Sequence, residues 1–309
     1  MSLNLTILQI ASPTMDSERG HRLRVRASYW IAALSMFALF LYGADYYLSN
    51  ERQRALSQKH VLLKPGGTIG LTLGILGFCL FLVVFLYPVR LRWAWLSRQG
   101  SSRHWMDFHI LLGIITPLII SFHASFNARG IAGMAYWMMI LVAFSGIVGR
   151  YIYAQIPRTL NDTAMTFKCG QEQIAKFTLR IRGLGVVLPQ DVDEAFQLPN
   201  LRQAEEMSLA SALWVMLAFD LAFSFRMWRF KRKVLWRCSL MRFGRSPDVP
   251  IRRSIYLARE QALLSKRMLF LSKSQQMLRV WHIVHRPFSY AFAVLALLHV
   301  ILMVTFGYY

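Results

Sequence analysis

The sequence is poor in cysteine, and its stretch 155–280 lacks nucleotide-binding motifs. The three cysteines, Cys79, Cys169 and Cys238, lie far apart in a chain of 309 residues. This spacing excludes a C-x-x-C-H attachment site for c-type haem and an iron–sulfur motif within the chain. The stretch 155–280 contains no G-x-G-x-x-G and no P-loop, so we do not expect a nucleotide-binding domain there.

Acidic residues are also scarce, because 15 Asp and Glu stand against 36 Lys and Arg, for a net charge of +21. An excess of this size is typical of proteins that bind nucleic acid. Here, however, the basic residues lie between and beside long apolar runs, as they do in the cytoplasmic loops of membrane proteins. We therefore expect no nucleic-acid partner, and instead contact with anionic membrane lipid or an acidic soluble protein.

Long apolar runs dominate what is present, since 55% of the residues are hydrophobic. A membrane core of about 30 Å is crossed by roughly 20 helical residues, and a backbone in lipid must satisfy its hydrogen bonds internally. The sequence therefore predicts an all-α integral membrane helical bundle with five, or alternatively six, transmembrane helices. The five predicted spans are 27–47, 66–87, 106–126, 131–154 and 283–306.

The sixth candidate, 207–225, is apolar but is interrupted by Asp220 and followed at once by Arg226. If it crossed, the stretch 226–279, with 15 Lys and Arg and two acids, would lie outside, against the positive-inside rule. We therefore expect an interfacial or bundle-capping helix, and keep a sixth span as the alternative.

Basic loops predict the domain organisation and orientation. Residues 1–154 are expected to form transmembrane helices one to four, and 283–309 the last one. The mostly helical insertion 155–282 is expected to be cytoplasmic, because most of its charged residues are basic. This arrangement puts the N-terminus in the cytoplasm, with the protein in a bacterial inner membrane. The loop between the first two spans is also basic and does not fit this orientation.

Four of the eight histidines form two matched pairs within predicted spans. His109 and His123 lie in the third span, and His285 and His299 in the fifth. Each pair is 14 residues apart, which is about 40° short of four full helical turns and a rise of about 21 Å. Both rings of a pair therefore project from nearly the same face, one near each end of the hydrocarbon layer.

Two such helices predict two levels at which imidazoles face one another. A haem b inside a helical bundle needs one neutral imidazole on each side of its iron, from different helices. We therefore predict two haem b groups, with His109, His123, His285 and His299 as the axial ligands of the iron. A single histidine in a membrane helix can also satisfy a neighbouring hydroxyl or line a proton path.

Other residues have predicted supporting roles around these groups. Gly113, one turn beyond His109, would let a flat porphyrin approach, or is simply a packing glycine. Arg150 and Arg286 are candidates to pair with haem propionates, as is Arg129, although boundary arginines also extend to lipid headgroups. His282 and His104 are expected at the interface, touching a propionate or a quinone. His21 and His60 are expected to be exposed to solvent.

Three stretches resemble bacterial membrane di-haem cytochrome b subunits: H109-I-L-L-G-I-I-T-P with His123, S145-G-I-V-G-R-Y-I-Y, and W281-H-I-V-H-R-P with His299. Their histidine layout is similar to the transmembrane domain of ferric reductases and NADPH oxidases. The resemblance covers the last three predicted spans and implies that His109 pairs with His285, and His123 with His299. If 207–225 crossed the membrane, His109 would instead face His299, and His123 would face His285.

The chain departs from ferric reductases and NADPH oxidases in one respect. Those families carry a cytosolic flavin and nicotinamide domain, whereas this sequence stops just after the last predicted span. We therefore expect an electron-transfer subunit of an oxidoreductase complex. It would be reduced by an iron–sulfur or flavin partner subunit on the cytoplasmic side and oxidised by a periplasmic acceptor. The alternatives are a quinol-dependent reductase of an external acceptor such as ferric iron, and a haem-free proton or solute transporter.

Overall fold

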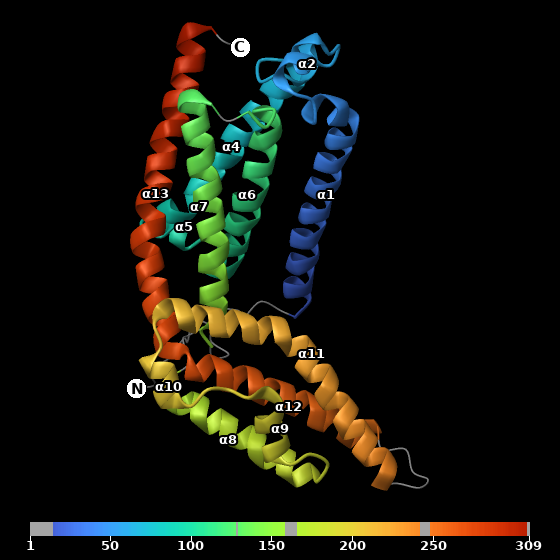
Figure 1. Ribbon diagram of the computed structural model, residues 1–309. Coiled ribbons are helices and arrows are strands. Elements are labelled where there is room, and N and C mark those ends of the chain that lie inside the picture. Colours follow the sequence, from blue (N-terminus) through green and yellow to red (C-terminus); the bar gives the residue numbers. More distant parts are fainter. Residues whose placement is uncertain (1–14, 128, 158–165, 242–247, 308–309) are drawn as a thin grey trace, which may run out of the picture. The chain divides into compact units, whose positions relative to one another are not determined.

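The computed structural model describes residues 15–127, 129–157, 166–241 and 248–307, and these ranges contain helices and no strand (Figure 1). Six of the helices in these ranges are long and apolar enough to span a membrane. This confirms an all-α bundle of a multi-pass membrane protein. The helices are α1 (Met15–Tyr47), α2 (Glu51–Leu56), α3 (His60–Leu63), α4 (Thr68–Arg90), α5 (Ala94–Ser97), α6 (Ser102–His123), α7 (Gly130–Gln155), α8 (Phe167–Leu184), α9 (Pro189–Phe196), α10 (Leu201–Glu206), α11 (Leu209–Met241), α12 (Asp248–Leu269) and α13 (Leu271–Phe306).

The chain divides into two compact units. Unit 1 comprises Met1–Ile147 and His285–Tyr309, and unit 2 comprises Val148–Val284. Helices α7 and α13 contribute to both units, because each runs through a boundary without a break. The two units are described separately below.

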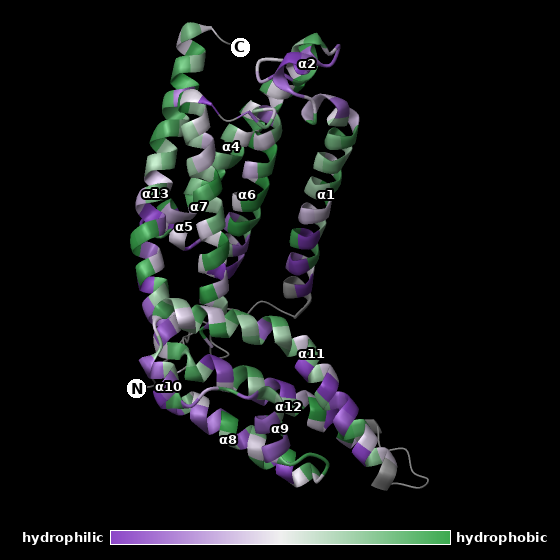
Figure 2. Ribbon diagram, viewed as in Figure 1, coloured by the Kyte–Doolittle hydropathy of each residue, from purple (hydrophilic) through white to green (hydrophobic). Residues whose placement is uncertain are grey.

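Unit 1 is built around the close pairing of α4 and α6. A Cβ atom added to Gly77 of α4 would lie 2.3 Å from Cδ1 of Ile120 of α6, so a larger residue here would have to displace the Ile120 side chain. Buried Leu73, Leu111 and Ile119 belong to the apolar core that α4 and α6 share with α1. Figure 2 shows mainly hydrophobic colour along α4, α6 and α7, as expected for helices in lipid.

Within unit 1, α7 and α13 run in opposite directions, whereas α6 and α13 run the same way (Figure 1). The end of α7 lies beside the start of the α13 segment, because Ser145 Oγ is 2.6 Å from His285 Nδ1. The chain therefore leaves unit 1 after Ile147 and re-enters it at His285 at the same end. An odd number of membrane crossings between these two residues would bring α13 in from the other end.

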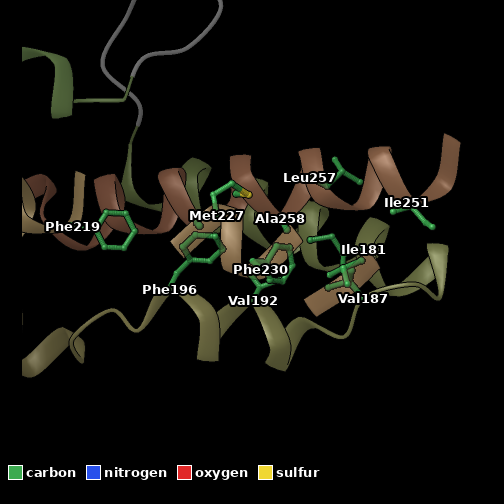
Figure 3. Packing of buried hydrophobic residues seen from close by; sticks show 12 residues of the cluster. Ile181, Val187, Val192, Phe196, Phe219, Met227, Phe230, Ile251, Leu257 and Ala258 are labelled. Carbon is green, nitrogen blue, oxygen red and sulfur yellow. The ribbon is translucent and has the colours of Figure 1, made fainter. Parts of the chain in front are cut away.

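Unit 2 is a helical bundle with its own apolar core, formed by α8, α9, α11 and α12 (Figure 3). Helix α11 contributes Phe219, Met227 and Phe230 to this core, which also contains Phe196 of α9 and Ala258 of α12. Both α8 and α12 are amphipathic. Their outer faces carry exposed basic side chains, including Lys176, Arg180, Arg252 and Arg253, as amphipathic helices around an apolar core do.

Asp220, which interrupts the apolar run in α11, is the centre of a polar cluster in unit 2. Its carboxylate accepts hydrogen bonds from Tyr151 Oη at 2.8 Å, Gln155 Nε2 at 3.2 Å and Lys266 Nζ at 2.5 Å. Only 2% of the Lys266 side chain is exposed. Burial lowers the pKa of Lys266, and the bond to Asp220 opposes that shift. The acid therefore compensates a buried ammonium group.

This buried pair predicts a marked non-additivity between Asp220→Asn and Lys266→Met. The first change leaves an ammonium group buried without its counter-ion, which costs about 3–5 kcal/mol. The double variant removes both charges, and we expect it to be more stable than Asp220→Asn alone. Unfolding of the full chain in detergent micelles, followed by circular dichroism, gives the free energy of unfolding of each single variant and of the double variant. Simple addition of the two single losses would contradict this pairing.

Candidate functional site

The four histidines within the bundle lie on α6 and α13 of unit 1, on helices that run in the same direction (Figure 1). His109 begins the third turn of α6, and His123 is its last residue. Because α6 and α13 run in the same direction, His123 and His299 both lie toward the C-terminal ends of their helices. Their partners in sequence, His109 and His285, lie 14 residues earlier on the same two helices.

His109 is held by a backbone carbonyl of α4. Its Nδ1 lies 3.1 Å from the oxygen of Val84. Within a helix this oxygen would normally bond the N–H four residues later, but that residue is Pro88, which has no N–H. The proline therefore leaves a carbonyl unpaired in an apolar layer, and the imidazole satisfies it. The ring of Tyr87 packs beside His109 at 5.1 Å between centroids.

His123 is held by α4 in the same way, near the other end of the helix pair. Its Nδ1 lies 2.8 Å from the oxygen of Gly70. A Cβ atom added to Gly74 would lie 2.6 Å from the His123 ring, so glycine at this position makes room for the imidazole. The two acceptors on α4, at residues 70 and 84, are separated by the same 14 positions as residues 109 and 123 on α6.

His285 is held by a hydroxyl of α7. Its Nδ1 lies 2.6 Å from Ser145 Oγ, and this hydroxyl donates its own proton to the oxygen of Val142 at 2.9 Å. Because a hydroxyl has one proton, Ser145 accepts from the imidazole. The Nδ1 atom of His285 therefore carries the hydrogen.

Three of the four imidazoles thus use Nδ1 as a donor to a fixed oxygen. A neutral imidazole with its hydrogen on Nδ1 has its lone pair on Nε2. The same tautomer, oriented by an oxygen acceptor, is the usual state of a histidine that binds a metal. The arrangement can therefore provide metal-binding nitrogen atoms at two levels of one helix pair.

The surface of α6 between these two levels has room and an unsatisfied polar atom. A Cβ atom added to Gly113 would meet nothing within 4 Å, which does not support the packing role for this glycine. Thr116 lies midway between His109 and His123, and among the described residues its Oγ1 is buried without a hydrogen-bond partner. Thr116 is seven residues from each histidine, a rotation about 20° short of two full turns. It therefore lies on the same face of α6 as both histidines. These residues fit a flat, partly polar group against α6.

The other residues predicted to contact the haem groups are divided between the two units. Arg286, next to His285, belongs to unit 1 and is exposed. Arg150 and His282 belong to unit 2, where the His282 ring packs against Trp281 at 4.8 Å between centroids.

The other histidines of unit 1 form polar contacts at the ends of helices. His21 stacks on His104 at 3.8 Å between ring centroids, and its Nε2 lies 3.4 Å from Asp107 Oδ2. His60 Nδ1 lies 3.1 Å from the hydroxyl of Tyr46. The expectation that His21 and His60 are simply exposed to solvent therefore missed their partners.

Arg129 lies at an open pocket of about 450 Å³, beside the end of α6 that carries His123. Its guanidinium is 2.9 Å from Glu51 Oε2. Arg54 lines the same pocket and donates to the backbone oxygens of Tyr47, Ser49 and Ser125. Arg129 is therefore paired with a carboxylate at the surface.

Sequence reasoning missed the three groups that hold the histidines. Ser145 lies in one of the three stretches that carry the resemblance, and the side chain of Val84 carries no chemical signal of its own. The available signal for Val84 was Pro88 four residues later, since such a proline leaves a carbonyl without its helical partner. Across the described ranges no three His, Cys, Asp or Glu side chains form a site for a metal ion. A haem iron requires only two protein ligands, so this finding does not bear on haem.

Comparisons of the chain with protein-family models, with curated proteins and with solved structures gave no match.

The two glycines near the histidines predict opposite responses to alanine. Gly74→Ala places a methyl group against the His123 ring and is expected to lower the melting temperature of the protein. In the haem-free protein, Gly113→Ala enters open space, and alanine is a better helix former than glycine by about 1 kcal/mol, so no loss of melting temperature is expected for that form. Thermal unfolding of both variants in detergent tests this difference, and equal effects would contradict the geometry.

Proposed function

We propose that this chain is a transmembrane di-haem b cytochrome that passes electrons across the membrane as a subunit of a larger redox complex. His109 pairs with His285, and His123 pairs with His299, as axial ligands. The observation that carries the proposal is the anchoring of three of these rings through Nδ1 at two levels of one bundle. The parallel directions of α6 and α13 (Figure 1) support this pairing over the crossed one.

The residues of the chain hold the ligand rings and exclude water. Val84, Gly70 and Ser145 fix the ring orientation and increase the basicity of the opposite nitrogen. Buried Ile115 and Ile119 keep the layer between the two levels apolar. When bound, haem b would supply one-electron redox chemistry, and two histidine ligands would leave its iron no position for oxygen. Gly113 and Thr116 provide the face of α6 on which this group lies.

The proposed topology has five spans, with α11 outside the hydrocarbon layer and unit 2 in the cytoplasm of a bacterium. It is supported by the position of Ile147 and His285 at one end of unit 1 and by the basic surface of unit 2. The proposed electron donor is an iron–sulfur or flavin subunit that docks on exposed basic residues such as Arg252, Arg253 and Arg259. The proposed acceptor lies on the periplasmic side.

A quinol-dependent reductase is the second candidate, and the His21–Asp107 pair favours it. An imidazole beside a carboxylate is a suitable acceptor for the protons that a quinol releases on oxidation. In both candidates Arg150 and Arg286 would pair with haem propionates. His282 would contact a propionate or the quinone. Oxidation of a quinol analogue by the purified chain alone distinguishes the two candidates.

The pairing predicts how many haem groups each variant retains. A pyridine haemochrome assay with protein quantitation should give two haem b per chain. His123→Ala, His299→Ala and their double variant should each retain one, because both residues serve the same haem. The double variant His109→Ala with His299→Ala should retain none, because it removes one ligand from each level.

His21→Ala and His60→Ala are the matched controls and should keep both haem groups. A wild-type preparation without haem would refute the proposal. One haem in the His109→Ala, His299→Ala variant, together with none in the His123→Ala, His299→Ala variant, would instead support the crossed pairing.

Ser145 is proposed as a positioning residue for His285. Ser145→Ala removes the acceptor for Nδ1, and loss of such an outer partner typically reduces affinity for a metal group about 10–100-fold. We expect weaker retention of one haem, because the His285 imidazole becomes less basic. The midpoint potential of that haem alone should shift. Ser145→Thr retains the hydroxyl and should restore the potential. A shift of both potentials would indicate a general structural effect.

A further inference from the structure

Helix α11 of unit 2 has a second apolar face, opposite the one in the bundle core. Its core face contains Phe219, Met227 and Phe230. The opposite face is exposed, with fractions of 68% for Trp214, 73% for Leu221, 59% for Phe225, 50% for Trp228 and 70% for Trp236. These five residues recur at intervals of three, four, seven and eight, which places them on one side of a helix. We name them the outer stripe of α11.

A stripe of this kind is not left exposed to water in a stable protein. Large exposed apolar patches mark a surface that contacts a partner or a membrane. Tryptophan and phenylalanine on a helix with basic neighbours are typical of helices that lie in the headgroup layer of a bilayer. The composition of the outer stripe therefore favours a bilayer surface as its cover.

The charges around the outer stripe are basic. The Arg229 guanidinium lies 5.9 Å from the centre of the Phe225 ring, and the Arg232 guanidinium lies 4.7 Å from that of Trp228. The only acid in the sequence of α11 is Asp220, and its carboxylate bonds Lys266. The outer stripe therefore combines aromatic rings with guanidinium groups. This combination matches a surface that has a negatively charged layer above an apolar one.

We propose that the outer stripe of α11 docks on the anionic headgroup layer of the membrane, with its rings among the upper acyl chains and its arginines at the phosphates. The spanning helices of the chain keep α11 close to a bilayer, which raises the effective lipid concentration. A crossing of the membrane by α11 is disfavoured, because Ile147 and His285 lie at the same end of unit 1 and basic helices cover the core face. The inference does not depend on haem.

Spin labels on the full chain in lipid nanodiscs test this docking. Cysteines are introduced at Leu221→Cys or Phe225→Cys in a variant whose three native cysteines are replaced by serine. Gln173→Cys, on the exposed side of α8, is the control. In discs of phosphatidylcholine with phosphatidylglycerol, accessibility to oxygen and to a nickel chelate should place labels 221 and 225 about 5–10 Å below the headgroup boundary. The label at 173 should remain in water.

Charge reversal provides the second arm of the experiment. Each basic residue near an anionic surface contributes about fivefold to the docking equilibrium. Arg229→Glu with Arg232→Glu should therefore shift labels 221 and 225 toward water, as should pure phosphatidylcholine discs. Arg252→Glu with Arg253→Glu on α12 is the matched control and should leave them immersed.

Two results would overturn the proposal. Labels at 221 and 225 as accessible to the nickel chelate as the label at 173 would show that lipid does not cover the outer stripe. Labels near the bilayer midplane, with no response to lipid charge, would show that α11 crosses the membrane. The experiment uses no haem measurement, so its outcome is separable from that of the proposed function.

Discussion

The structure of unit 1 depends on one constraint, that a polar group within a membrane must find its partner inside the protein. Helix α4 contains a proline, Pro88, that deprives the carbonyl of Val84 of its helical hydrogen bond. Helix α6 satisfies this oxygen with His109 and bonds a second one, that of Gly70, with His123. Glycine at position 74 lets α4 come close enough for these bonds. The close pairing of α4 and α6 and the orientation of two imidazoles are therefore one feature of the molecule.

The same constraint operates where α7 and α13 meet, and again in unit 2. The Ser145 hydroxyl gives its proton to Val142 and receives one from His285, so both polar side chains are satisfied together. In unit 2 the carboxylate of Asp220 compensates the buried ammonium of Lys266. Unpaired, that ammonium group would destabilise the protein strongly. These two polar pairs thus help to fix how neighbouring helices pack.

Local sequence was sufficient to predict the apolar helices of unit 1, but their limits differed for identifiable reasons. The predicted span 106–126 ends at His123 in α6, because Ser125 and Phe126 adopt positive φ angles and stop the helix. The predicted span 283–306 is the last part of α13, which begins at Leu271 because that residue, Ser274 and Met277 are buried in unit 2. The stretch 207–225 likewise continues into the 33 residues of α11, whose buried core residues extend to Val234.

The sequence alone determined that the chain is an all-α membrane protein and that four histidines occupy two levels, because hydropathy and helical periodicity are local properties. It did not determine which oxygen atoms hold those histidines, because Val84 and Gly70 are distant in sequence and act through the backbone. Only the tertiary structure decided that Ser145 and Asp220 pair with His285 and Lys266. It also decided that α11 keeps one apolar face for the core and leaves the other exposed. These outcomes depend on which helices meet, and the pattern of a single helix does not encode its neighbours.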